Sequence, residues 1–265
     1  MTSTEEKLTV HGSSPDEILS PLPQSFRSAL VSMYRGEPQL GSDGQLHSLN
    51  GTCIFRELGM WLYDLCRKVK PQNTLEIGLA YGYSTVYLLA AIRENGVGRH
   101  TAVDPFQSHW HGIGRSQARS LGMSDSFRYI DEKSVPALVH FADRGEAFEL
   151  IYIDGNHRFD DAFVDFTLAA EVCAMGGYIV LDDLSMPSIY RAVAFIRSNR
   201  KDFEEVTIAA PNIAAFRRIG QDTREWDHYV DFCGFNVRDT RNALRQFTPA
   251  FVRRGAKAIM RLAKP

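Results

Sequence analysis

The chain has 265 residues, of which 44% are hydrophobic and 23% are charged, and its formal net charge is −2. This length and composition predict one sizeable buried core with appendages, and the charge gives no electrostatic reason to expect a nucleic-acid partner. The N-terminus lacks a basic segment followed by an apolar one, and the longest apolar run, Tyr87–Ile92, is far too short to span a bilayer. The cysteines form no Cys-x-x-Cys pair, so we expect reduced thiols in a soluble, cytoplasmic protein: Cys53, Cys66, Cys173 and Cys233.

Residues 1–50 are rich in Ser, Pro and Gly and are predicted to form an N-terminal arm or lid. They contain one helical candidate, Pro23–Tyr34, and no strand-like alternation. A second helix is predicted over Cys53–Val69, where apolar residues recur at helical spacing and Lys70-Pro71 closes the run.

Short apolar strands then alternate with helices through residues 51–220, the predicted catalytic domain. This alternation predicts an α/β fold: a Rossmann-like, doubly wound and mostly parallel seven-stranded sheet, with helices on both faces and a late antiparallel hairpin. The strands are expected at Thr74–Ile77, Thr101–Val103, Phe127–Ile130, Leu150–Ile153, Tyr178–Leu181, Val206–Ala209 and Ala214–Arg217.

Residues 221–265 are predicted to be a basic, helical C-terminal extension. The segment 238–265 holds eight basic residues and one acidic residue, and its apolar residues fall on one side of a helix, opposite the basic ones. We favour a helix that packs on its own domain or on a partner subunit of a homo-oligomer. Peripheral contact with a membrane or another partner is the alternative.

The stretch LEIGLAYGYST predicts a cofactor site where a strand ends and a helix begins. Glu76 and Gly78 stand at the end of the strand, Gly82 lets the backbone approach a ligand, and Ser84-Thr85 stand near the start of the helix. The Gly-x-Gly-x-x-Gly pattern of dinucleotide sites is absent, which disfavours a nicotinamide oxidoreductase.

The next strand ends in Asp104, where a carboxylate could accept hydrogen bonds from a ribose diol. A ligand with ribose and no pyrophosphate suggests S-adenosylmethionine. LEIGLAYGYST and VDP resemble the first and second motifs of class I S-adenosylmethionine-dependent methyltransferases. The predicted cofactor-binding residues are Glu76, Gly78, Tyr81, Gly82, Ser84, Asp104, Phe106, Asp131 and Asp154.

The segment after Asp104 is expected to shape the pocket. Trp110 could stack near the adenine or the substrate, and Gln107, His109 and His111 could line the pocket mouth. Asp131-Glu132 after the third strand could approach the adenine amine, or they could be an ordinary solvated acid pair.

Two later strands end in acidic residues, and they predict the reacting group. IDGNH places His157 three residues after Asp154, and GGYIVLDD ends in Asp182-Asp183. If these strands are parallel neighbours, their carboxyl ends lie at one edge of the sheet and bring the acids together. A divalent cation such as Mg²⁺, held by Asp154, Asp182 and Asp183, would relieve their repulsion and bind acceptor hydroxyls, with Asp154 and His157 as the catalytic residues.

This arrangement resembles two metal-dependent branches of the same methyltransferase class. In catechol O-methyltransferases an acid follows the fourth strand and an acid-amide pair the fifth, but here the amide is an Asp and the catalytic Lys is replaced by His157. Macrolide-sugar O-methyltransferases carry Asp-x-x-His, with the His as base, and an acidic pair after the next strand. IDGNH and LDD resemble that branch more closely.

The resemblance implies metal-assisted O-methylation of a small hydroxylated acceptor, such as a sugar unit or a secondary metabolite. A metal-independent N- or O-methyltransferase remains open, because Asp154 and either Asp182 or Asp183 could instead cap helices, or the acids could position the substrate directly. The alternative outside the enzymes is a non-catalytic scaffold that binds the cofactor and docks through its basic tail.

Overall fold

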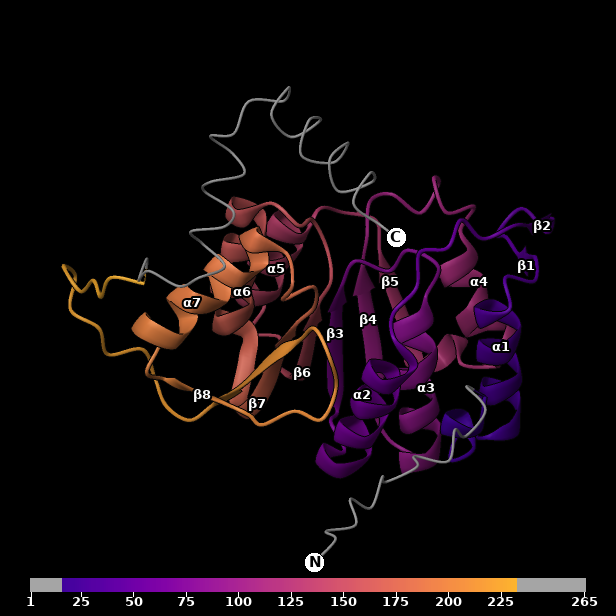
Figure 1. Cartoon of the computed structure of the whole chain (residues 1–265), viewed down its shortest axis with the longest axis horizontal. Helices are drawn as coiled ribbons and strands as arrows, with labels where there is room; N and C mark the ends of the chain where they lie inside the picture. The colour runs from indigo at the N-terminus through magenta and orange to yellow at the C-terminus, as the bar shows by residue number, and fades with distance from the viewer. Residues whose placement is uncertain (1–15, 233–265) are drawn as a thin grey trace, which may run out of the picture.

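The computed structural model describes residues 16–232, so the predicted C-terminal helix lies outside the described residues. Its centre is a seven-stranded sheet with the strand order β5-β4-β3-β6-β7-β9-β8, and the late pair of strands is antiparallel (Figure 1). This topology confirms the predicted Rossmann-like fold class. The strands of this sheet are β3 (Asn73–Ile77), β4 (Arg99–Val103), β5 (Phe127–Ile130), β6 (Phe148–Ile153), β7 (Cys173–Leu181), β8 (Phe203–Glu205) and β9 (Ala214–Arg218).

Helices cover both faces of the sheet because its central strands carry buried apolar side chains on both sides. One core cluster packs helices α1, α2, α3 and α4 against one face of the sheet. The other packs α5, α6 and α7 against the opposite face (Figure 1). The helices are η1 (Glu17–Leu19), α1 (Gln24–Tyr34), α2 (Arg56–Val69), α3 (Tyr83–Asn95), α4 (Ile113–Ser120), η2 (Ser124–Ser126), α5 (Ser134–Asp143), α6 (Phe159–Val172) and α7 (Pro187–Asn199).

The described part of the predicted N-terminal arm packs onto the sheet domain. Phe26, Leu30 and Met33 of α1 are at most 1% exposed and belong to the same core cluster as α2 and α3. A two-stranded antiparallel sheet of β1 (Gln39–Leu40) and β2 (Leu46–His47) follows, although the sequence shows no strand-like alternation there. Hairpin strands of two residues are too short to produce such a pattern. The domain boundaries at residues 50 and 220 stay predictions.

The predicted strand at Val206–Ala209 is wrong, because the strand that pairs with β9 is Phe203–Glu205. In this edge strand only Phe203 is buried and its two glutamates are exposed, so no apolar run marks it. Val206 and Ile208 instead pack, partly buried, against the core cluster of α2 and α3. Their apolar character therefore reflects burial against this cluster rather than a strand.

No helix among residues 16–232 combines the length and the apolar character that a membrane crossing requires. Within the same residues Cys53, Cys66 and Cys173 form no disulfide.

Candidate active site

The turn between β3 and α3 lies at the carboxyl edge of the sheet, and two glycines make it possible. Gly78 has φ +92°, and a Cβ built on it would overlap the carbonyl oxygen of Asp154 at the end of β6. Gly82 has φ +83°, and its Cβ would lie 3.0 Å from Gly114 Cα. Only glycine combines this backbone conformation with so close an approach. The turn is thereby held directly beside Asp154.

Asp104, at the end of β4, fixes the same turn from the neighbouring strand. Its Oδ2 accepts hydrogen bonds from the amides of Leu79 at 3.1 Å and Ala80 at 2.9 Å, and its Oδ1 accepts one from Phe106 N at 2.7 Å. The Asp104 side chain is only 5% exposed. A carboxylate in this position orders the cofactor turn before any ligand binds.

Glu76 lies beneath the turn rather than in a cavity, which differs from its predicted contact with the cofactor. It is fully buried, and its carboxylate accepts hydrogen bonds from the hydroxyls of Ser84 and Thr85 in the first turn of α3. His100 Nε2 lies 3.0 Å from its Oε2. Glu76 and Ser84 therefore support the turn by joining β3 to α3.

A cavity of about 440 Å³ opens at the carboxyl ends of β3, β4 and β6. Four predicted cofactor residues line it, namely Gly78, Asp104, Phe106 and Asp154, together with Trp110. Its remaining lining residues come from β3, β4, the starts of α5 and α6, and the loop before α6: Ile77, Ala80, Val103, Pro105, Lys133, Ser134, Val135, Gly155, Asn156, Arg158, Asp161 and Asp165. We refer to it as the cofactor cavity.

A second cavity, of about 140 Å³, lies on the other side of the β3–α3 turn, and we refer to it as the acceptor cavity. The segment before α2 covers it with Thr52, Cys53, Ile54 and Phe55, which the sequence reasoning did not identify. Its remaining lining residues are Gly78, Leu79, Ala80, Tyr81, Gly82, Tyr83, Ser84, Asp154, His157, Asp182, Asp183 and Asn212. Gly78, Ala80 and Asp154 line both cavities, so the two spaces meet at these residues.

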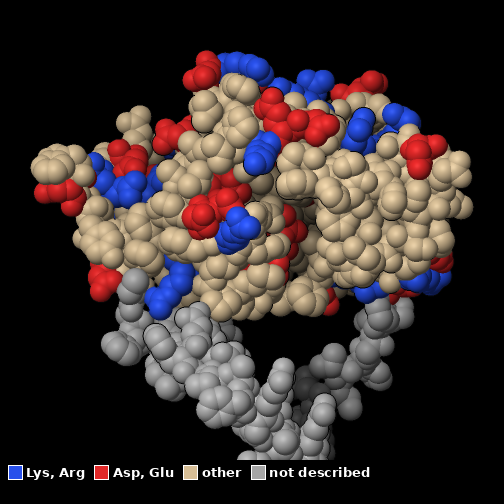
Figure 2. Space-filling view, turned by 90° about the horizontal axis from the view of Figure 1, so that it is seen from above, with Lys and Arg blue, Asp and Glu red and all other residues tan. Residues whose placement is uncertain are grey.

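Three side chains converge at this junction: Asp154, His157 and Asp183, each with a ligand atom within 4.8 Å of the others. His157 Nε2 lies 2.8 Å from Asp183 Oδ2 and 3.4 Å from Asp154 Oδ1. β6 and β7 are parallel neighbours, with Ile153 opposite Leu181, and this register aligns the residues that follow them. Acidic side chains gather at a hollow near the centre of the face shown in Figure 2.

The cluster shifts the protonation of its own members. Burial raises the pKa of Asp154 to about 7, against the opposing effect of its hydrogen bond to His157. Hydrogen bonding to Asp154 and then to Asp183 raises the pKa of His157 to about 10, and the hydrogen bond from His157 lowers the pKa of Asp183. Without a cation, the imidazole therefore carries a proton at neutral pH and neutralises part of the acidic charge.

Asp182 was predicted as a metal ligand, and it lines the acceptor cavity without belonging to the group of three. Its Oδ2 accepts a hydrogen bond of 2.5 Å from Tyr152 Oη, and its Oδ1 accepts one of 2.7 Å from the amide of Asp183. Burial raises the pKa of Asp182. Asp182 thus orients Asp183, which has φ +56°, while Asp183 joins the cluster.

Asn212 is a site residue that the sequence reasoning missed. Its Nδ2 donates a hydrogen bond of 2.9 Å to Asp183 Oδ1, and its Oδ1 accepts one of 2.6 Å from the amide of Ser185. Ala214 of β9 pairs with Leu181 of β7, which places the loop before β9 at the same edge. A Pro-Asn turn just before the predicted last strand is the signal that could have indicated it.

The remaining predicted residues do not line the cofactor cavity. Asp131 is exposed and lines a separate cavity of about 340 Å³ with Gln107 and His111. His109 meets Phe106 edge to face with ring centroids 5.9 Å apart, and Glu132 Oε2 lies 3.3 Å from the Nδ1 of His140. Buried Tyr81 packs edge to face on Trp110 and so joins the two cavities through an aromatic wall.

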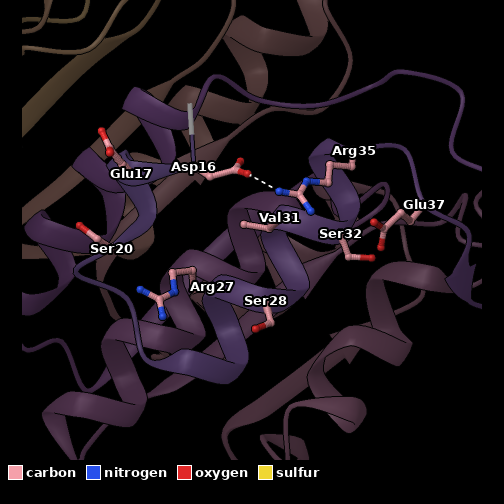
Figure 3. A pocket seen from close by; sticks show the side chains of 9 residues that line it. All are labelled: Asp16, Glu17, Ser20, Arg27, Ser28, Val31, Ser32, Arg35 and Glu37. Atoms are coloured by element: carbon pink, nitrogen blue, oxygen red, sulfur yellow. Dashed lines mark hydrogen bonds and ion pairs between the residues drawn. The ribbon is translucent and has the colours of Figure 1, made fainter. Parts of the chain in front are cut away.

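Another cavity, of about 490 Å³, lies beside α1 (Figure 3). Arg27 and Arg35 face three acids there, and Arg35 Nη2 lies 2.7 Å from Asp16 Oδ2. Mixed exposed charges of this kind are typical of a solvated surface, and none of the residues predicted for the site lines this cavity.

Comparison with known proteins relates this geometry to a family. Residues 75–184 match the family model described as Methyltransferase domain. A relative described as caffeoyl-CoA O-methyltransferase, from Populus kitakamiensis, is 29% identical over 118 residues, which cover 44% of this chain. The match spans 45% of that relative's length, less than half of it.

Solved structures show the same fold. An O-methyltransferase from Bacillus cereus in complex with SAH is 18% identical, has a TM-score of 0.58 and covers 77% of this chain and 96% of its own. The SAH-bound methyltransferase PaMTH1 of Podospora anserina is 14% identical, with a TM-score of 0.58, and covers 76% of this chain and 92% of its own. Residues 75–184 thus match a methyltransferase domain, and the fold around them is that of solved methyltransferases.

Proposed function

We propose that this chain transfers the methyl group of S-adenosylmethionine to a hydroxyl of a small acceptor, with a divalent cation at the acidic cluster. The observation that carries the proposal is the meeting of two cavities at Asp154. A donor in one cavity and an acceptor in the other would present their reacting atoms beside the same cluster. Such positioning supplies a large part of the rate enhancement of group-transfer enzymes.

The cofactor cavity fits an adenosyl ligand in shape and chemistry. The glycine turn leaves room for the ligand beside the backbone, Asp104 stands where ribose hydroxyls can donate to it, and Phe106 and Trp110 offer aromatic surface. The SAH held by the solved O-methyltransferase from Bacillus cereus supports the same ligand here. Because Asp154 lies at the junction with the acceptor cavity, the sulfonium end belongs at that junction and the adenine at the far end.

The cluster also fits a divalent cation. Asp154 and Asp183 offer two carboxylates whose ligand atoms lie within 4.8 Å of each other and of a ring nitrogen of His157, which is left free to act as a base. Carboxylates suit hard cations such as Mg²⁺ and Mn²⁺. When bound, such a cation neutralises the carboxylates and lowers the pKa of an acceptor hydroxyl.

His157 is the base in this proposal. The acceptor oxygen forms a bond to the methyl carbon, the carbon–sulfur bond breaks with its electron pair passing to sulfur, and the hydroxyl proton moves to His157 Nε2. Because the neighbouring carboxylates raise the pKa of His157 to about 10, the imidazole can act only when their charge is neutralised in another way. The proposed activity therefore couples proton transfer to occupation of the acidic cluster.

Metal-independent transfer is the second candidate, and one distance favours it. His157 Nε2 lies 2.8 Å from Asp183 Oδ2, so the imidazolium already balances part of the acidic charge without a cation. In that case the carboxylates would position the acceptor hydroxyl directly.

Calorimetric titration with S-adenosylhomocysteine and methyl-transfer assays against catechols and vicinal diols, each with Mg²⁺, Mn²⁺ or a chelator, test the proposal. We expect S-adenosylhomocysteine to bind with micromolar affinity, and we expect the chelator to abolish methyl transfer. Asp183→Asn and His157→Gln should bind S-adenosylhomocysteine as the wild type does, yet lose about 100-fold or more in turnover. Asp160→Asn, an exposed carboxylate of α6, is the matched control.

The outcomes separate the candidates. Transfer that survives the chelator and depends on His157 would replace the first candidate with the metal-independent one. Failure of the wild-type protein to bind S-adenosylhomocysteine under any condition would contradict both candidate functions.

A further inference from the structure

A row of aromatic side chains runs across α6 and α7, which pack against each other on one face of the sheet (Figure 1). It consists, in this order, of Phe159 and Phe163 of α6, Phe195 of α7, and Phe232 and Tyr229 from the segment after β9. Successive ring centroids lie 5.8, 4.8, 5.4 and 6.3 Å apart. We refer to these five residues as the aromatic row.

The aromatic row is only partly covered by residues 16–232. Phe159 is 39% exposed and Tyr229 is 64% exposed, while the other three rings are half-buried. Val164, next to the row on α6, is 36% exposed. Single apolar side chains at a surface are common, but a contiguous group of this size is typical of a contact surface.

The chain leaves the described part of the structure at this row. Asn199 of α7 is fully buried and holds the backbone of Val230 by two hydrogen bonds. Its Nδ2 donates to Val230 O at 2.9 Å, and its Oδ1 accepts from Val230 N at 2.7 Å. Two residues later the ring of Phe232 packs edge to face on Phe195. The residues that follow Phe232 therefore start on the aromatic row itself.

The sequence that follows has the composition that such a face requires. Its apolar residues fall on one side of the predicted helix, and they are Phe251, Val252, Ala256, Ile259, Met260 and Ala263. A helix over residues 251–263 would be about 20 Å long, which is comparable with the four centroid steps of the row.

Charge also favours contact between this segment and the rest of the chain. Segment 238–265 contains eight of the 30 basic residues and one of the 32 acidic residues, so it carries a net charge of +7 and the remainder carries −9. Opposite net charges attract the segment to its own domain, whereas two copies of the remainder repel each other.

We propose that residues 251–263 dock as an amphipathic helix on the aromatic row of their own chain, with their basic side toward solvent. Only 18 residues separate Phe232 from Phe251. A short connection of this kind gives an effective concentration on the order of millimolar, so the segment outcompetes a second copy or a lipid surface for the row. The proposal does not depend on the proposed function, because no residue of the row lines either cavity.

Hydrogen–deuterium exchange of the full chain, read by mass spectrometry in dilute solution, tests the docking. We expect the amides of residues 251–263 to exchange at least about tenfold more slowly than in an unstructured peptide. Phe159→Ser combined with Phe163→Ser removes the α6 half of the row without altering either core cluster, so this protection should be lost. Leu46→Ser is the control, since Leu46 is 69% exposed in β2 on the other side of the molecule (Figure 1).

Several results would overturn the proposal. Unprotected amides in wild type, or protection that survives the double variant, would show that the row does not hold the segment. Protection that appears only at concentrations where light scattering detects a dimer would assign the row to a second copy. Protection that requires phosphatidylserine vesicles would assign the segment to a membrane surface.

Thermal melts establish that the double variant is folded. Tyr229→Ser combined with Phe232→Ser removes the other half of the row and provides the same test if the α6 variant does not fold. Protection that survives this second variant, once it is shown to be folded, would overturn the proposal equally.

Discussion

At the scale of single residues, the most demanding position is Glu76, a carboxylate with no exposed surface. The strand residue is tolerated because the hydroxyls of Ser84 and Thr85 donate to it and the ring of His100 lies within hydrogen-bond distance. Buried polar networks of this kind stabilise a fold when all members are satisfied and weaken it when one is not.

Replacing Glu76 with Gln tests this account. The amide would turn an NH₂ group toward at least one donor, so we expect a loss of about 1–3 kcal/mol in the free energy of unfolding, measured by chemical denaturation. Glu37→Gln, at an exposed position, should change it by less than about 0.5 kcal/mol. Equal stability of the Glu76 variant and wild type would show that the network contributes nothing.

Asp165 makes stability depend on pH. Burial raises the pKa of its carboxyl to about 6, above the value near 4 expected in the unfolded chain. Between these values the folded state keeps a proton that the unfolded state has lost, so its contribution to stability is present below pH 4 and is lost by about pH 6. Asp165→Asn should therefore gain up to about 3 kcal/mol relative to wild type between pH 4 and pH 7.

Thermal melts of both proteins across that pH range measure the difference directly. Asp160→Asn should show no comparable trend, because its side chain is exposed. A difference between Asp165→Asn and wild type that stays constant with pH would refute the assignment.

At the scale of elements, the end of α6 depends on a residue of the last strand. Arg218 of β9 donates from Nη1 to the carbonyl oxygens of Ala170 at 3.0 Å and Cys173 at 2.5 Å, where α6 passes directly into β7. These carbonyls have no helical partner, and a guanidinium also interacts favourably with the negative end of the helix dipole.

Arg218→Gln should consequently cost about 1–2 kcal/mol in the free energy of unfolding. Its neighbour Arg217 provides the matched control, since it is exposed and pairs with Glu204 at 3.6 Å. Arg217→Gln should change stability by less than about 0.5 kcal/mol in the same denaturation assay. If both variants lose the same free energy of unfolding, the contact of Arg218 with α6 makes no specific contribution to stability.

How much of the molecule can be read from its sequence is also a question of elements. The parallel strands carry continuous apolar runs, and the carboxyl ends of neighbouring strands share an edge, so the fold and the meeting of Asp154, His157 and Asp183 could be predicted. Edge strand β8 lacks such a run. The roles of Asp182 and Asn212 could not be predicted, because they depend on one hydroxyl inside β6 and on a loop far along the chain.

At the scale of the whole molecule, the N-terminal segment belongs to the core. Phe26, Leu30 and Met33 are almost completely buried, and each contributes roughly 2 kcal/mol of hydrophobic stabilisation, against a net stability of about 5–15 kcal/mol for an ordinary domain. An arm that could move independently would not bury such side chains.

A chain that lacks residues 1–50 should therefore lose its cooperative thermal transition and aggregate on expression. Circular dichroism melts and size-exclusion chromatography measure both effects. Phe26→Ala in the full-length chain should be folded but weaker by about 3–5 kcal/mol, whereas Leu46→Ala, at a position that is 69% exposed, should resemble wild type. A shortened chain that melts as the full-length chain does would show that residues 1–50 are a separate arm and not part of the core.

The position of β3 has a consequence for how the protein is made. This strand pairs on one side with β4, which follows it closely, and on the other with β6, which begins about 70 residues after β3 ends. While a ribosome is still adding residues 104–147, the nascent sheet has an open, apolar edge at its future centre. Synthesis of β6 is thus the step that closes this edge, and slow translation before it would prolong exposure to chaperones and to other nascent chains.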